Sequence, residues 1–112
     1  MIDQTIEETL ELAFEANNRA RRTGIELAQA DAKARAALKS QEIALHAQNV
    51  YPVSMLRDIA KGSHSVSSLI EAADVARAIY ESDREEVLLR KRQLTVLEEQ
   101  AKRDWAEAGR IL

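Results

Sequence analysis

Residues 6–45 read IEETLELAFEANNRARRTGIELAQADAKARAALKSQEIAL, and small or apolar residues recur in this stretch at alternating steps of four and three. This spacing places them on one stripe of a long helix, as in a heptad seam that faces a second helix. We predict one helix over residues 5–48, opened by a capping box of Thr5 and Glu8, with a close approach of the neighbouring helix at Gly24. Nine of the twelve seam positions are apolar or Gly, and three are polar. The twelve positions are Ile6, Leu10, Ala13, Asn17, Ala20, Gly24, Leu27, Asp31, Ala34, Leu38, Gln41 and Leu45.

A second stretch with the same spacing predicts a helix over residues 68–110, opened by Ser68 and Glu71. Between the helices, residues 49–67 carry the one Pro and four of the seven Ser, and predict a connector. Within it we expect a short helix over 55–61, capped by Ser54 and closed by Gly62. The second seam is Leu69, Ala73, Ala76, Tyr80, Asp83, Val87, Arg90, Leu94, Leu97, Ala101, Asp104 and Ala108.

Composition restricts the fold class and the compartment. The 112 residues allow one domain, and three Gly, one Pro and 4% aromatic residues disfavour an all-β sandwich. We therefore expect an all-α domain over 1–112, an antiparallel helical hairpin of coiled-coil type. Cys is absent, the acidic start lacks signal-peptide character, and no apolar run is long enough to span a membrane. These features predict a cytoplasmic protein without a cofactor or a membrane partner.

Each predicted helix carries a second apolar row that one neighbouring helix cannot cover. An apolar face wider than one seam requires another partner, so we expect a homodimer or higher homo-oligomer that forms a helical bundle. The rows are Phe14, Ile25, Ala28, Ala32 and Ile43 in the first helix, and Ala72, Val75, Ile79, Leu89, Val96 and Trp105 in the second. The candidate interface residues are Leu10, Phe14, Leu27, Leu38, Tyr80, Val87, Leu94, Leu97 and Trp105.

The register of the hairpin has two alternatives at this stage. In the first, Gly24 faces Arg90 and Asp31 faces Asp83. In the second, Asp31 faces Arg90, which pairs opposite charges. We favour the second, because a polar seam residue with a partner fixes a register at lower cost.

Two surfaces are candidate binding sites. Six cations, Arg19, Arg21, Arg22, Arg90, Lys91 and Arg92, could contact phosphates if the register brings them together; otherwise they form a solvated helix face. The connector residues Tyr51, Met55, Leu56 and His64 could form a protein-docking tip, or could cap the open end of the bundle.

No residue set indicates catalysis or metal binding. His46 and His64 lack the spacing of a metal site or a catalytic triad, and the acidic stretch 81–86 fits surface pairs such as Glu86 with Arg90. We therefore expect no enzyme activity, no catalytic residue and no metal site.

Three segments carry a family resemblance: EANNRARRTGIELAQADAKARAAL, PVSMLRDIAKG and DVARAIYESDREEVLLRKRQLTVLEEQAKRDW. They resemble small all-helical accessory proteins of tailed phages and prophages of Gram-positive bacteria. The resemblance implies a phage accessory role and carries over no catalytic residue. The resulting hypothesis is a non-enzymatic, oligomeric helical adaptor that binds protein. The alternatives are a nucleic-acid-binding factor of phage DNA recombination or replication, and an inhibitor of a host defence protein.

Overall fold

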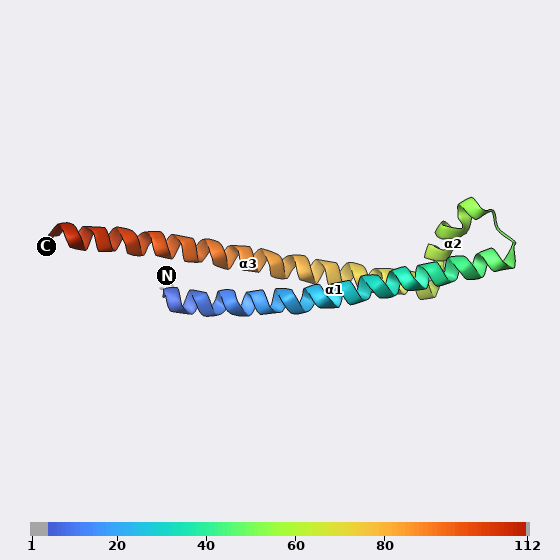
Figure 1. Cartoon of the computed structure of the whole chain (residues 1–112), viewed down its shortest axis with the longest axis horizontal. Helices are drawn as coiled ribbons and strands as arrows, with labels where there is room; N and C mark the ends of the chain where they lie inside the picture. The colour runs from blue at the N-terminus through green and yellow to red at the C-terminus, as the bar shows by residue number, and fades with distance from the viewer. Residues whose placement is uncertain (1–4, 112) are drawn as a thin grey trace. The chain divides into compact units, whose positions relative to one another are not determined.

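The computed structural model describes residues 5–111, and side chains through residue 110. The elements are α1 (Ile6–Gln48), a 3-10 turn η1 (Val53–Met55), α2 (Leu56–Gly62) and α3 (His64–Ile111) (Figure 1). No strand occurs in this range. The prediction of an all-α helical hairpin with a short connector helix is confirmed, and the first helix ends at the predicted residue.

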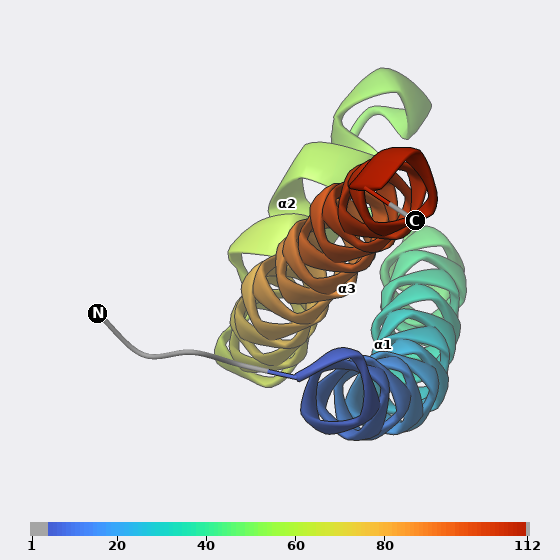
Figure 2. The same ribbon diagram turned by 90° about the vertical axis from the view of Figure 1, so that its left-hand side faces the viewer.

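The chain divides into two compact units, which we describe separately. The terminal unit holds residues 1–22 and 81–112, and the connector unit holds residues 23–80. In each unit a segment of α1 runs beside an antiparallel segment of α3 (Figures 1 and 2). In the terminal unit these are the beginning of α1 and the end of α3.

The connector differs from its prediction at both helix starts. Ser54 does not cap α2, whose N-cap position is Met55 without a side-chain hydrogen bond. The third helix begins at His64 rather than at residue 68, so the predicted Ser68–Glu71 capping box is wrong. Ser63 alone separates α2 from α3, with extended backbone (φ −68°, ψ 143°). Ser68 lies inside α3, where its hydroxyl donates to the Ser65 carbonyl (3.2 Å), a backward bond that a helix tolerates.

The end of α1 uses Asn49 rather than a glycine. Asn49 has a φ of 54°, and its N–H donates to the His46 carbonyl at 3.1 Å. Asn tolerates this left-handed conformation and ends helices there. Gly62 was predicted to follow the short helix, but it is the last residue of α2, and its φ is not positive. At the start of α1, the Glu8 N–H donates to Thr5 Oγ1 at 3.1 Å, which confirms this half of the predicted capping box.

The core of the connector unit lies where α2 meets the end of α1. Leu45, Leu56 and Ala60 form one buried cluster, with Leu38 and Ile59 packed against it. Leu45 and Leu38 come from the predicted seam of the first helix. The short helix therefore buries one face because it supplies Leu56 and Ala60 four residues apart.

In the terminal unit the seam of α1 lies one residue away from its predicted position. Thr9 and Ala16 are buried there, whereas Leu10 is 53% exposed and Ile6 and Asn17 are also exposed. The predicted seam is therefore wrong at these three positions. Burial of Thr9 costs little, because its hydroxyl donates to the Thr5 carbonyl at 3.0 Å. The buried residues, Thr9 and Ala16, are small, and small side chains on the seam allow two helices to pack closely.

The terminal unit confirms part of the predicted seam of the second helix. Val87, Arg90, Leu94 and Leu97 are half-buried, as a seam facing α1 requires. The last three seam positions, Ala101, Asp104 and Ala108, are exposed instead.

Both predicted registers are wrong. In the connector unit, Arg77 pairs with Asp31 at 2.9 Å, and Gly24 lies against Tyr80. In the terminal unit, Arg19 pairs with Glu86 at 2.8 Å. Each unit thus matches α1 residues with α3 residues nearer the connector than either prediction did.

Gly24 is the predicted point of close approach. A Cβ added there would lie 3.0 Å from Tyr80 Cε1, and α1 continues through this position. Expected contact between the helices at Gly24 is therefore confirmed.

We predict that Gly24→Leu lowers the free energy of unfolding by about 1–3 kcal/mol, because the added side chain overpacks against Tyr80. Gly109→Leu is the matched control, since a Cβ at Gly109 meets nothing within 4 Å; it should change stability by less than about 0.5 kcal/mol. Urea unfolding followed by circular dichroism measures both. Equal effects of the two substitutions would contradict the close approach.

Candidate interaction surfaces

The six predicted cations do not form one free basic belt. Glu86 lies 2.8 Å from Arg19 and 3.6 Å from Arg90, so both arginines share one carboxylate. Arg90 also donates to Gln93 Oε1 at 3.0 Å, and its Nε is buried without a hydrogen-bond partner in the structure. The predicted Glu86–Arg90 pair is confirmed. These contacts make Arg90 part of the helix seam rather than of an open surface.

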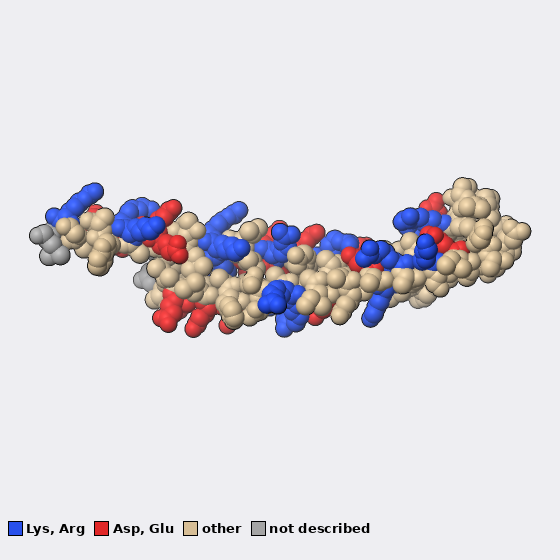
Figure 3. Space-filling view, in the orientation of Figure 1, with Lys and Arg blue, Asp and Glu red and all other residues tan. Residues whose placement is uncertain are grey.

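The other four cations are exposed. Arg21 and Arg22 lie on α1, and Lys91 and Arg92 on α3. Within residues 5–111 none of these four has an ion pair. Figure 3 shows basic and acidic side chains interspersed on both helices of this unit, including acidic side chains near the start of α1. A mixed surface of this kind is typical of solvated helices.

The connector tip retains only part of its predicted set. Tyr51, Met55 and His64 are exposed, but Leu56 is 7% exposed and belongs to the buried cluster. The assignment of Leu56 to a docking surface is therefore wrong, because α2 turns this side chain inward. Sequence reasoning missed Val50 and Val53, which are 71% and 72% exposed. Their position on both sides of Pro52 in an irregular segment was the available signal.

The second apolar rows of both helices are exposed in the single chain. All eleven predicted row residues, from Phe14 to Trp105, have exposed side chains. The candidate interface residues separate into two groups. Leu10, Phe14 and Trp105 are exposed, whereas the other six are half-buried on the α1–α3 seam of their own unit: Leu27, Leu38, Tyr80, Val87, Leu94 and Leu97.

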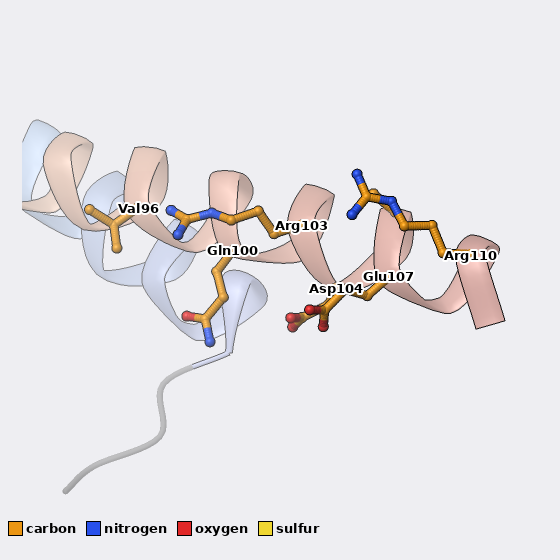
Figure 4. A pocket seen from close by; sticks show the side chains of 7 residues that line it. Val96, Gln100, Arg103, Asp104, Glu107 and Arg110 are labelled. Carbon is orange, nitrogen blue, oxygen red and sulfur yellow. The ribbon is translucent and has the colours of Figure 1, made fainter.

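The end of α3 borders an open hollow of about 630 Å³ in the terminal unit (Figure 4). All of its lining residues belong to this one helix, so no second described element encloses it. They are Val96, Gln100, Arg103, Asp104, Ala106, Glu107 and Arg110. A hollow with one wall is an unoccupied helix face rather than a small-molecule pocket.

The described part of the chain offers no arrangement of ligands for a metal ion. No group of three or more His, Asp or Glu side chains could hold one within it. His46 lies in the last turn of α1 and His64 opens α3, and both are exposed. No helix between residues 5 and 111 is both apolar and long enough to cross a membrane.

Comparisons of the chain with protein-family models, with curated proteins and with solved structures give no match.

The shared carboxylate of Glu86 yields a stability prediction. Glu86→Gln removes the carboxylate charge that lies against Arg19 and the half-buried Arg90, so we expect a loss of about 1 kcal/mol in the free energy of unfolding. Glu85→Gln is the control, because Glu85 is exposed and has no ion pair in the described range. Thermal unfolding at low ionic strength compares the two variants. Equal melting temperatures would show that the shared pair contributes nothing.

Proposed function

We propose that the protein is a non-enzymatic helical adaptor of phage type, which self-associates and acts through protein–protein contacts in the host cytoplasm. The observation that carries this proposal is the size of the single-chain core. Among the described residues, the buried apolar side chains are four Ala, two Leu and one Val. An Ala side chain buries little apolar area, so the single chain gains little hydrophobic stabilisation from this core.

The exposed apolar side chains offer the apolar area that the small core does not bury. Fifteen large hydrophobic residues are exposed in the described range, and they occur in both units. Phe14 and Val96 belong to the terminal unit, and Val75 and Ile79 to the connector unit. Contiguous apolar surface on a small protein marks an interaction site. Association of identical hairpins into a bundle would cover such rows with helix faces of matching kind.

The row on the connector unit allows a direct test of self-association. Val75→Asp with Ile79→Asp should weaken self-association at least about tenfold, because carboxylates would enter an apolar interface. Both residues are exposed in the single chain, so its own core stays intact. Size exclusion with light scattering over a concentration series is the measurement.

Ala78→Asp is the matched control for this test. Ala78 is exposed on the same stretch of α3 but is not in the apolar row, and the change should leave the assembly unaltered. A native protein that stays monomeric at all concentrations would remove the self-association from the proposal. Equal weakening by the control would remove the row from it.

A second candidate function, nucleic-acid binding, is favoured by one observation. Arg21, Arg22, Lys91 and Arg92 are exposed and have no ion pair in the described range. Against it, Glu7, Glu8, Glu11 and Glu15 are exposed in the same unit, and the chain has a net charge of −3. An inhibitor of a host defence protein would use protein contacts and falls within the first proposal.

We expect no gel shift of single- or double-stranded DNA at low salt, because the cations do not form a continuous basic surface. A shift that weakens steeply with salt and is lost in Arg21→Glu with Lys91→Glu would establish the second function instead. Arg35→Glu in the connector unit is the control for the change in net charge.

A further inference from the structure

The beginning of α1, in the terminal unit, has an outer side on which carboxylates and large apolar side chains occur together. Residues 5–18 contain four Glu and no Lys or Arg, and Figure 3 shows acidic side chains near the start of α1. Four exposed residues at helical spacing lie on one side of the helix and form what we call the acidic face: Glu7, Leu10, Glu11 and Phe14. Within the described residues, neither carboxylate of this face has an ion pair.

The part of α1 in the connector unit carries the opposite charge beside small side chains. Residues 27–41 contain three cations and one acid, Asp31, which is half-buried in an ion pair. Four exposed residues at spacings of four and three lie on one side of the helix and form what we call the basic face: Ala28, Ala32, Arg35 and Lys39. Neither cation of this face has an ion pair in the part of the chain that the structure describes.

The two faces complement each other in charge and in size. The two Glu of the acidic face are four residues apart, and so are the two cations of the basic face, so both pairs repeat at about 6 Å along the helix. Leu10 and Phe14 are also four residues apart and are 53% and 68% exposed. Ala28 and Ala32 have the same spacing and leave room beside the helix that large side chains can fill.

We propose that the acidic face of one copy docks on the basic face of a second copy. The carboxylates of the acidic face would pair with Arg35 and Lys39, and its large side chains would pack against Ala28 and Ala32. This inference rests on the proposed self-association and names surfaces that produce it. The contact is separate from the α3 row tested above, and both would contribute to the bundle.

Other occupants fit these faces less well. Two acidic faces, or two basic faces, would bring like charges together, which is unfavourable across an interface. In the terminal unit, the exposed Leu88 and Leu89 of α3 have charges of both signs beside them, Glu85 and Lys91, and so select neither face. Phosphates of a nucleic acid would contact the basic face but not the acidic face, which carries the large apolar side chains.

Charge reversal of either face tests the contact. We expect Glu7→Lys with Glu11→Lys to weaken self-association at least about tenfold, and Arg35→Glu with Lys39→Glu to do the same, because each variant presents like charges on both faces. Sedimentation velocity over a concentration series at low salt measures the assembly. Circular dichroism of each variant checks that α1 stays helical.

A mixture of the two variants provides the decisive measurement. The first variant has two basic faces and the second has two acidic faces, so an equimolar mixture should associate in a 1:1 ratio although neither variant associates alone. Arg57→Glu with Lys61→Glu is the matched control, because these two cations are exposed, four residues apart and outside both faces. It makes the same change in net charge as the second variant and should alter self-association less than about twofold.

Four results would overturn the proposal. A native assembly that neither reversal alters would remove this contact and leave the proposed self-association in place. A mixture that does not associate, or a control that weakens assembly equally, would show that the two faces do not meet. A DNA gel shift that Arg35→Glu with Lys39→Glu abolishes would assign the basic face to a nucleic acid. A native protein that stays monomeric would remove the self-association itself, and this contact with it.

Discussion

The close approach of α1 and α3 is the constraint on which the other features of the structure depend. Thr9 and Ala16 fill the seam of α1 in the terminal unit, and Gly24 meets Tyr80 in the connector unit. Small side chains bring two backbones together and maximise contacts between them, but they remove little apolar surface from water. Large apolar residues on the seam, such as Leu27, Val87 and Leu94, are only half-buried. Phe14 and Val75 are exposed because they lie on helix faces away from the seam, and Trp105 is exposed at the end of α3.

The same closeness explains how charge enters the seam. Arg90 occupies a seam position on α3 and is half-buried, which is costly for an unpaired cation. Glu86 lies one turn before it and also reaches Arg19 on α1, so one carboxylate neutralises cations of both helices. In the connector unit, Asp31 and Arg77 make the equivalent connection. These pairs match one register only, and they compensate for the weak specificity of an Ala-rich seam, which offers no shape to distinguish neighbouring heptads.

Sequence periodicity predicted the helices well because their length makes the pattern strong. The bounds of α1 and the half-buried positions from Val87 to Leu97 follow from spacing alone. Periodicity gave the wrong answer where the size of a side chain decides which residue is buried, or where a single residue decides where a helix begins. Leu10 and Thr9 are adjacent in the sequence, and spacing alone does not predict that the smaller residue, Thr9, is the one buried against α3. Four Ser in the connector can each precede a helix, and spacing alone does not show that α3 begins directly after Ser63, whose hydroxyl donates to the Ala60 carbonyl of α2.

The candidate surfaces were predictable to the same extent. Exposure of the second apolar rows followed from their angular position, whereas Leu56 lies in the core because the short helix folds back on α1. No single residue of the sequence predicts that the end of α3 is exposed. It depends on the register, which determines where α1 begins relative to α3, and so it required the ion pair between Arg19 and Glu86.

In the proposed assembly, the stability of the chain and its binding to other molecules would be coupled. Its single-chain core contains three buried apolar side chains larger than Ala in the described range, so in the proposed assembly contacts with other molecules would contribute a large share of the apolar burial. A partner that binds only the folded state stabilises that state by mass action. The exposed rows would then act at two levels at once: they recognise a partner, and they supply apolar burial that the close α1–α3 seam cannot provide. In that assembly, the small residues on the seam and the large residues outside it would be linked, because the little apolar area that the seam buries would be supplemented by the burial of the outer rows.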